Sequence, residues 1–216
     1  MAKVAPTRPG GRFIVLEGID GAGTTTQARR LAAALTARGI DCHTTREPSD
    51  GPIGALVRAS LAAGGPAFDA AGRALLFAAD RLHHVAAEID PHLARGAWVV
   101  SDRYLLSSLA YQGLDCDEAW VRAINRYARA PDRTILLDVP AEEAVRRIRA
   151  RAAAAGGAAQ HYETPRTLAR LCERYRTLAA SEGAVVVDGI RPVEAVTRAV
   201  VAALADLLPP APGTPA

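Results

Sequence analysis

Residues 13–29, FIVLEGIDGAGTTTQAR, run from an apolar stretch through a glycine-rich turn into a helix-forming segment. Gly18, Gly21 and Gly23 allow the backbone of the turn to curl around a polyanion, where a Cβ atom would block close approach. A helix that begins directly after the turn points its unpaired N–H groups and the positive end of its dipole at the same phosphates. The stretch therefore predicts a strand, a phosphate-binding loop and a helix.

The loop departs from the usual phosphate-loop pattern, G-x-x-x-x-G-K-[ST], at one position. Gly18 and Gly23 keep the spacing, and Thr25 occupies the position of the hydroxyl that ligates Mg²⁺. Thr24, however, stands where a lysine normally reaches the β- and γ-phosphates. Because a hydrogen bond to a charged group contributes about 1.5–3 kcal/mol, this loss would slow phosphoryl transfer about ten- to a hundredfold unless another cation substitutes. On the loop alone, a turn that binds nothing is an equally good interpretation.

Composition favours one folded domain that stays in the cytoplasm. The 216 residues, half of them hydrophobic, suffice for a full core. A formal net charge of +3 with dispersed arginines gives no case for a nucleic-acid partner. Cys42, Cys116 and Cys172 lie far apart, as expected of reduced thiols. No apolar run approaches the roughly 20 residues that span a bilayer, so no membrane contact is expected.

Short β-branched runs alternate with alanine- and arginine-rich segments, the order typical of a parallel sheet with helices on both faces. Strands are expected at Phe13–Glu17, Asp41–Thr45, Trp98–Ser101, Thr134–Asp138 and Val185–Asp188. Helices are expected at Thr25–Arg38, Gly54–Ala62, Asp69–Arg95, Ser107–Tyr127, Ala141–Ala155, Pro165–Ser181 and a last segment with Val193, Val196, Val200, Leu204 and Leu207 on one stripe. Such an α/β fold binds its ligands at the carboxyl ends of the strands.

The ends of the chain and one interior segment differ from this regular pattern. Residues 1–11 are expected to form a flexible tail, residues 12–208 the folded domain, and the proline-rich residues 209–216 a disordered tail. Gly156 and Gly157 interrupt an alanine-rich helix, which makes the segment from about residue 150 to 163 a candidate lid.

Charged residues follow directly after two of the predicted strands, where a ligand is expected. Asp102 and Arg103 come after Trp98–Ser101, and Arg46 and Glu47 follow the second strand. A carboxylate beside a phosphate loop can hold Mg²⁺, and arginines there can bind a phosphate through two parallel hydrogen bonds. The first pair could instead cap a helix, and the second could form a surface ion pair.

Two adjacent histidines, His83 and His84, fall in a predicted helix. Neighbouring residues of a helix point about 100° apart, so a metal ion shared by the two rings is not expected. We interpret both as surface positions or as helix positions whose hydrogen bonds are satisfied.

Taken together, five segments resemble the bacterial thymidylate kinases in order and spacing. They are FIVLEGIDGAGTTTQ at 13–27, TTREPSDGPIG at 44–54, LLFAADR at 75–81, SDRYLLSSLAYQG at 101–113 and ILLDVPAEEAVRRIRAR at 135–151. The resemblance extends from about residue 13 to 207. It implies a P-loop NTPase three-layer α/β/α fold with a five-stranded parallel sheet and a small lid. It also implies transfer of the γ-phosphoryl group of ATP to dTMP, with Mg²⁺ as cofactor.

The resemblance further implies the residues that bind each ligand. ATP would be held by the loop residues Gly18, Ile19, Asp20, Gly21, Ala22, Gly23, Thr24, Thr25 and Thr26. The metal would be held by Thr25 and Asp102. The acceptor nucleotide would be bound by Asp20, Arg46, Glu47, Phe77, Arg81, Arg103, Ser108, Tyr111 and Gln112. In the last set, Phe77 matches the ring that stacks on thymine, Arg81 the guanidinium at its carbonyl edge, and Asp20 the carboxylate that receives the sugar 3′-hydroxyl.

The arginines ahead of the lid form an R-x-R-x-R run, Arg147, Arg149 and Arg151, which in some bacterial members places an arginine over the transferring phosphate. By this resemblance we expect Arg149 and Arg151 to join Asp102 and Arg103 in catalysis. Our hypothesis is that one or more of the run supplies the charge that Thr24 lacks. The alternative is a solvated helix face.

Three functions stay open on the sequence. The favoured one is an active dTMP kinase that binds dTMP and ATP. A second is a P-loop kinase for another pyrimidine nucleotide, and a third is a nucleotide-binding protein whose catalysis is weak or lost because of Thr24. Members of the resembled family are homodimers, and the predicted helix Asp69–Arg95 could form the interface.

Overall fold

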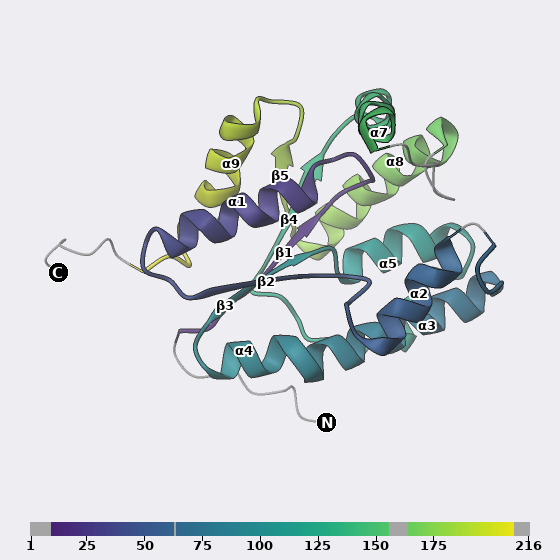
Figure 1. The fold of residues 1–216 in the computed structure, drawn as a ribbon, viewed down its shortest axis with the longest axis horizontal. Coiled ribbons are helices and arrows are strands. Elements are labelled where there is room, and N and C mark those ends of the chain that lie inside the picture. Colours follow the sequence, from purple (N-terminus) through teal and green to yellow (C-terminus); the bar gives the residue numbers. More distant parts are fainter. Residues whose placement is uncertain (1–9, 63, 156–163, 210–216) are drawn as a thin grey trace, which may run out of the picture.

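The computed structural model of the chain describes residues 10–62, 64–155 and 164–209. Its five strands form one parallel sheet in the order β2-β3-β1-β4-β5. The strands are β1 (Phe13–Glu17), β2 (Cys42–Arg46), β3 (Trp98–Asp102), β4 (Arg133–Asp138) and β5 (Val185–Asp188). Because β1 lies in the middle, the loop that follows it leaves the centre of the sheet (Figure 1). The predicted five-stranded parallel sheet is confirmed.

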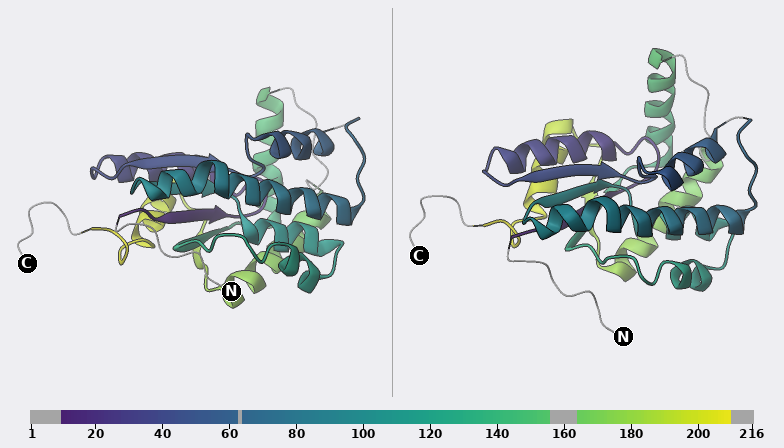
Figure 2. Two further views of the ribbon diagram at one scale, coloured as in Figure 1. Left: turned by 90° about the horizontal axis from the view of Figure 1, so that it is seen from below. Right: turned by 60° about the horizontal axis from the view of Figure 1, so that its bottom comes forward.

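Helices cover both faces of the sheet, as Figure 1 shows. One face carries α1 (Thr24–Thr36) and α9 (Val193–Ala202), which pack on each other. The opposite face carries α3 (Ala70–His84), α4 (Asp90–Ala94) and α5 (Leu105–Tyr111), with α2 (Pro52–Leu61) against α3 and α8 (Pro165–Glu182) against α5. Helix α7 (Ala141–Ala155) stands away from the body of the molecule at the end where β1 meets α1 (Figure 2).

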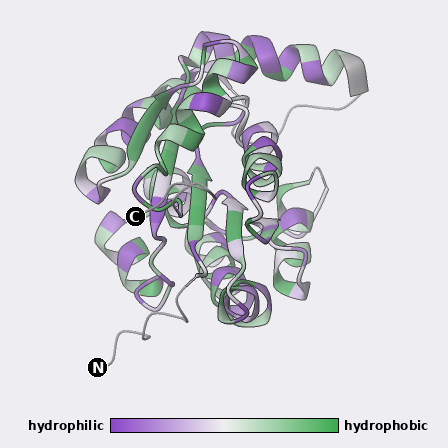
Figure 3. Cartoon of the chain, turned by 90° about the vertical axis from the view of Figure 1, so that its left-hand side faces the viewer, coloured by the Kyte–Doolittle hydropathy of each residue, from purple (hydrophilic) through white to green (hydrophobic). Residues whose placement is uncertain are grey.

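The central strand β1 is buried along its whole length, and its side chains alternate between two cores. Ile14 and Leu16 pack with Leu31 of α1, whereas Phe13 and Val15 pack in a second cluster under α4. A strand covered on both faces is apolar throughout rather than alternating with polar residues. Figure 3 shows these apolar strands at the centre of the molecule. The covered sheet fixes the position of the glycine-rich turn that follows.

The predicted strand boundaries agree with the structure to within one residue. Phe13–Glu17 and Val185–Asp188 are confirmed, and the other three strands shift or extend by one residue. The expected helices at the phosphate loop and at Pro165 are confirmed as α1 and α8, with small changes at their ends.

The predicted long helix Asp69–Arg95 is one continuous helical course with a change in its middle. Asp69 caps α3 by accepting a hydrogen bond from the N–H of Gly72 at 2.6 Å. A π-helical segment, η1 (Val85–Ile89), then joins α3 to α4. It lies just before Pro91, whose missing N–H cannot donate to a carbonyl one turn earlier.

The predicted helix Ser107–Tyr127 is wrong, because this stretch is divided. Helix α5 ends at Tyr111, a 3₁₀ turn covers Gln112–Leu114, and α6 (Glu118–Ile124) begins anew. Asp117 starts α6 by accepting a hydrogen bond from the N–H of Trp120 at 2.8 Å. The N-cap is the physical reason for the second start, since its carboxylate satisfies a donor at the first turn of α6.

The glycine hinge and most of the candidate lid, residues 156–163, lie outside the described residues, as do residues 1–9 and 210–216 of the two predicted tails. Helix α7 covers the beginning of the predicted lid. Among the helices that the structure describes, none combines the length and apolarity needed to cross a membrane.

Candidate active site

The glycine-rich turn adopts conformations that depend on its glycines. Gly21 and Gly23 have φ angles of 85° and 97°, in the left-handed region that side chains disfavour. A Cβ atom on Gly21 would lie 2.7 Å from the carbonyl oxygen of Ala144, so the loop also passes too close to α7 for a larger residue. Gly23 is the N-cap of α1, which begins at Thr24. The open amides and the helix dipole of this turn form an anion site at the centre of the sheet edge.

A cavity of about 650 Å³ lies beside this turn and is lined by eight of the nine predicted donor-site residues, all except Gly18. Thr24 lines it although only 6% of its surface is exposed, and Thr25 and Thr26 are exposed to it. The remaining walls come from α7 and from the loop that leads into α9. The lining residues are Ile19, Asp20, Gly21, Ala22, Gly23, Thr24, Thr25, Thr26, Gln27, Arg103, Glu143, Arg146, Arg147, Arg151, Gly189, Ile190, Arg191, Pro192, Val193 and Val196. We refer to this cavity as the donor pocket.

The three arginines of the R-x-R-x-R run occupy different positions around the donor pocket. Arg147 lies behind the loop, where it donates to the carbonyl oxygens of Gly21 and Ala22 at 3.4 and 3.3 Å and to that of Gly189 at 2.9 Å. Arg151 lines the pocket. Arg149 is exposed and is not part of the lining. The structure thus brings Arg147 and Arg151 to the loop, and leaves Arg149 on the outer side of α7.

Thr25 and Asp102 meet at the mouth of the loop, as the sequence predicts. The Thr25 hydroxyl donates to Oδ2 of Asp102. Oδ1 of Asp102 is buried and has no hydrogen-bond partner among the residues that the structure describes. An orphaned carboxylate oxygen beside a hydroxyl suits Mg²⁺, which takes one or two protein oxygens and completes its shell with water and phosphate. The described residues contain no cluster of three or more acidic, histidine or cysteine side chains that could form an all-protein cage.

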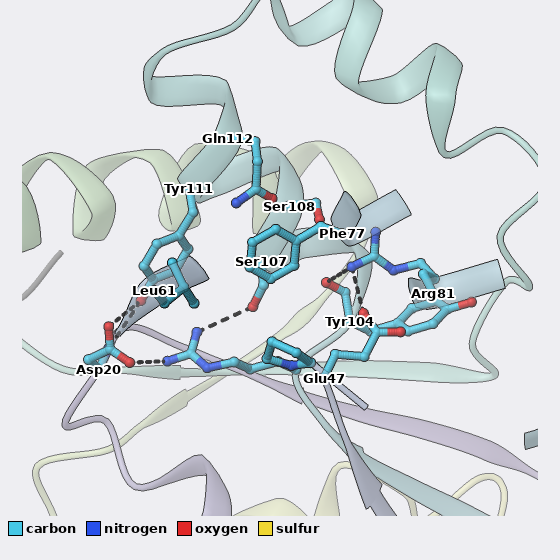
Figure 4. A pocket seen from close by; sticks show the side chains of 12 residues that line it. Asp20, Glu47, Leu61, Phe77, Arg81, Tyr104, Ser107, Ser108, Tyr111 and Gln112 are labelled. Carbon is cyan, nitrogen blue, oxygen red and sulfur yellow. Dashed lines mark hydrogen bonds and ion pairs between the residues drawn. The ribbon is translucent and has the colours of Figure 1, made fainter. Parts of the chain in front are cut away.

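A second, smaller cavity lies on the other side of Asp20, between α2, α3 and α5 (Figure 4). It has a volume of about 130 Å³. Eight of the nine predicted acceptor residues line it, all except Arg46. The lining residues are Asp20, Glu47, Pro48, Leu61, Phe77, Arg81, Arg103, Tyr104, Ser107, Ser108, Tyr111 and Gln112. We refer to this cavity as the acceptor pocket.

Arg103 stands between the two pockets and lines both, together with Asp20. Its guanidinium donates to the carbonyl oxygen of Gly18 at 2.8 Å and to Oδ1 of Asp20 at 2.7 Å, and it lies over the ring of Tyr111 at 5.3 Å. Its backbone has φ of 72°, which is strained for a residue with a side chain. That conformation turns the chain sharply after β3 and directs the guanidinium to the junction of the pockets.

Tyr111 holds Asp20 from the acceptor side. The Tyr111 hydroxyl donates to Oδ2 of Asp20 at 3.1 Å and accepts from the Asp20 N–H at 3.2 Å. Burial raises the pKa of Tyr111 well above its usual range, since desolvation disfavours the phenolate. The hydroxyl therefore stays a donor at every physiological pH, and the Asp20 carboxylate is fixed between it and Arg103.

Arg81 is almost fully buried, at 1% exposure, at the far end of the acceptor pocket. Its terminal nitrogens donate to Oδ1 of Asn125, to Oε2 of Glu47 at 2.6 Å and to the carbonyl oxygen of Tyr104 at 2.9 Å (Figure 4). Its Nε has no partner within the described parts of the chain. Three of its five N–H donors are used in these contacts, and a rigidly held guanidinium with donors left over can recognise a polar edge of a ligand.

Two more buried polar atoms line the acceptor pocket without a partner among the described residues, Oγ of Ser108 and Oε1 of Gln112. Phe77 offers an aromatic face to the same cavity. Buried polar groups are normally hydrogen-bonded, so unsatisfied ones that border a cavity indicate a ligand. An apolar face opposed by a few directional donors and acceptors suits a flat heterocycle.

Arg46 differs from the other predicted acceptor residues. Its guanidinium is largely exposed and pairs with Asp50 at 2.8 Å, four residues further along the chain. It is not part of the acceptor-pocket lining. Glu47, its neighbour, lies in the pocket wall and pairs with Arg81, so the predicted surface ion pair between Arg46 and Glu47 is wrong.

Several residues of the site escape sequence reasoning. Tyr175 of α8 lies about seventy residues from the strand end, yet its hydroxyl is 3.4 Å from Nη1 of Arg103 and 2.8 Å from Oγ of Ser107. Glu17 accepts hydrogen bonds from Ser107 and from the N–H of Tyr104. Burial raises the pKa of Glu17.

Asn125 holds Arg81 from the end of α6. Tyr175 and Asn125 belong to amphipathic helices, where nothing in the local pattern separates them from core residues.

A phosphate loop at the centre of a parallel sheet, with two pockets that meet at Asp20 and Arg103, defines a P-loop kinase that acts on a nucleotide. Comparison with known proteins gives the particular family. Residues 16–200 match the family described as "Thymidylate kinase". The thymidylate kinase of Xanthomonas euvesicatoria is 44% identical over 211 residues, which cover 93% of this chain and 88% of that protein. The thymidylate kinase of Rhizorhabdus wittichii is 44% identical over 92% of this chain and 99% of that protein. The chain belongs to the thymidylate kinase family, as its sequence motifs predict.

Proposed function

We propose that this chain forms dTDP by moving the γ-phosphoryl group of ATP onto dTMP, with Mg²⁺ held by Thr25 and Asp102. The supporting observation is that Asp20 and Arg103 line both the donor and the acceptor pocket. Two nucleotides bound in these pockets would meet end to end at Arg103. Phosphoryl transfer depends on such in-line placement and on neutralising the charge of two polyanions.

In this proposal the acceptor pocket selects thymidine by its shape and by its unsatisfied polar atoms. The base stacks on Phe77, and its carbonyl edge accepts a hydrogen bond from Arg81, whose Nε has no partner among the described residues after three internal contacts of the terminal nitrogens. Ser108 and Gln112 complete the polar edge. Asp20 receives the sugar 3′-hydroxyl. The hydrogen-bond pattern discriminates a base because a mismatched edge leaves buried groups unpaired.

Several groups neutralise the negative charge of the phosphates in this proposal. The loop amides and α1 face the β- and γ-phosphates, and Arg103 faces the acceptor phosphate, which Arg46 would join by leaving Asp50. Mg²⁺ held by Thr25 and Asp102 would neutralise part of the phosphate charge. Arg151 supplies the cation that Thr24 lacks, because it lines the donor pocket from α7. Arg149 is exposed and outside the donor-pocket lining, so in this proposal it contributes little to transfer, and Arg147 supports the loop from behind.

A coupled assay of dTDP formation tests the proposal. Turnover of dTMP should exceed that of dCMP and dGMP by at least about tenfold, the effect of one mismatched buried hydrogen bond. Preference for another pyrimidine nucleotide would contradict the assignment of the acceptor pocket. Calorimetry provides the second arm: tight binding of dTMP and ATP without turnover would favour a nucleotide-binding protein disabled at Thr24.

We also propose a homodimer that buries one side of α3. Leu75 and Leu82 are 50% and 37% exposed and stand seven residues apart, so they lie on the same face of the helix. Light scattering should give twice the chain mass for the wild type and a single chain mass after Leu75→Glu with Leu82→Glu. A wild-type monomer at micromolar concentration would refute this interface.

A further inference from the structure

Behind the acceptor pocket lies a buried histidine, His84, at the end of α3. Its side chain is completely buried, and both ring nitrogens have polar partners. Nδ1 lies 3.3 Å from Oε1 of Glu47, and Nε2 lies 2.6 Å from the hydroxyl of Thr45 in β2. A polar ring costs free energy in a core unless its hydrogen bonds are made, and a leucine would fill the same space without that cost. The ring therefore needs an explanation beyond packing.

The contacts of Glu47 show what the ring holds in place. One carboxylate oxygen, Oε2, accepts from Arg81, and the other, Oε1, has His84 as its partner. The backbone N–H of Glu47 donates to the carbonyl oxygen of Asp102 at 3.0 Å, so the residue joins the acceptor pocket to the end of β3. Since a carboxylate oxygen accepts, Nδ1 of His84 carries the proton of this hydrogen bond. Without it, the Glu47 carboxylate would keep only its contact to Arg81, and the position of Arg81 would be set less firmly.

The outer side of the ring is fixed by a second set of contacts. Nε2 lies 3.5 Å from Oε2 of Glu88, whose other oxygen is 2.8 Å from Nε2 of His43. Glu88 belongs to the π-helical segment η1, and His43 stacks on His92 of α4 with ring centres 3.7 Å apart. Segments of this kind often occur at functional sites. The chain of contacts runs from the acceptor pocket to the surface beside β2.

We propose that His84 is a positioning residue for the acceptor base: through Glu47 it holds Arg81 in the orientation in which its guanidinium lines the acceptor pocket. The inference rests on the proposed function, in which Arg81 binds the base. His84 itself touches no substrate. Its loss should therefore weaken dTMP binding and leave ATP binding in the donor pocket unchanged.

The test compares three replacements of His84, with His83→Ala as the matched control on the same helix. His84→Asn keeps an N–H near the position of Nδ1, whereas His84→Gln places its amide near Nε2, and His84→Leu keeps neither. The KM for dTMP should rise about tenfold in the Leu and Gln variants, the contribution of one hydrogen bond to a charged group. It should stay within about threefold of wild type in the Asn variant. The KM for ATP should change less than about twofold in all of them.

A double-mutant cycle separates positioning from general support of the fold. In a Glu47→Ala background, His84→Leu should cause no further rise in the KM for dTMP, because the residue through which it acts is gone. Effects that multiply in the cycle, or folded Leu and Gln variants with wild-type dTMP affinity, would overturn the proposal. Equal losses in the Asn and Gln variants would also overturn it. Circular dichroism identifies any variant that fails to fold, and the Asn and Gln pair then carries the comparison.

The outcomes distinguish this inference from the proposed function. Calorimetry with dTMP gives the same comparison without turnover. A wild-type protein that binds no dTMP would refute both. A wild-type protein that binds and phosphorylates dTMP, with His84 variants that behave like it, would refute the positioning role alone.

Discussion

Replacing Arg151 with alanine should disable transfer more than any other change in α7. Arg151 lines the donor pocket, where Thr24 offers no charge to the transferring phosphate. A hydrogen bond from a cation to a charged group contributes about 1.5–3 kcal/mol, and each 1.4 kcal/mol is about tenfold in rate. Arg151→Ala should therefore lower kcat about ten- to a hundred-and-fiftyfold. Arg149→Ala, two residues away on the exposed side of α7, should cost less than about threefold.

A lysine at position 24 provides the complementary experiment. Thr24 already lines the donor pocket, which has a volume of about 650 Å³, so a lysine there can extend toward the phosphates. In the wild type, Thr24→Lys should change kcat less than about threefold, since the charge is already supplied. In the Arg151→Ala background, the same lysine should restore about tenfold or more of the lost rate.

The assay is coupled dTDP formation at saturating ATP, dTMP and Mg²⁺, with single-turnover measurements to separate chemistry from product release. Two results would refute the reasoning. One is an Arg151→Ala variant that retains more than a third of the wild-type kcat. The other is a wild-type protein that gains tenfold from Thr24→Lys, which would mean that the loop is uncompensated.

Three further outcomes can be measured independently. Phe77→Leu should raise the KM for dTMP about two- to tenfold by removing an aromatic face, with Phe77→Tyr close to wild type and the KM for ATP unchanged; an unchanged dTMP KM would place the base elsewhere. Asp102→Asn should raise the half-saturating Mg²⁺ concentration at least about tenfold without loss of folding by circular dichroism, and an unaltered magnesium titration would exclude the metal role. Burial raises the pKa of Cys42 to about 11, so its thiolate fraction at pH 8 should be roughly a hundredfold below that of an ordinary thiol. Alkylation of Cys42 by iodoacetamide, followed by mass spectrometry, should accelerate about tenfold per pH unit up to about pH 11, and a plateau below pH 9.5 would contradict this.

The parts of the fold that could be predicted are those with local causes. Apolar β-branched runs favour a strand, and glycines permit a positive φ without strain. Both signals depend on only a few neighbouring residues, so β1, the turn at Gly21 and the start of α1 could be predicted. The division of Ser107–Tyr127 has a local cause as well, the Asp117 N-cap, but the helix-forming residues on either side conceal it. The π-helical segment before Pro91 likewise has a local cause that the surrounding helix-forming residues conceal.

The parts of the site that could not be predicted depend on contacts between distant elements. His84 looks like an ordinary helix residue, and its partner Glu47 lies thirty-seven residues away. Tyr175 reaches Arg103 from a helix at the other end of the chain. Sequence spacing cannot show that Arg147 faces the loop carbonyls while Arg149 faces outward, because this depends on how α7 is set against the loop. Motif resemblance predicted the acceptor residues, and the geometry shows which contacts hold them in place.

The backbone of Arg103 has a consequence for engineering this enzyme. A left-handed conformation costs a residue with a side chain about 1–2 kcal/mol, which glycine would recover. Where that relief outweighs the lost contacts to Gly18 and Asp20, a library screened for heat resistance would reward Arg103→Gly, and the same clone would lose the guanidinium at the meeting point of the two nucleotides. Selection for thermal stability alone would enrich inactive variants, so each round of selection has to measure turnover as well as melting temperature.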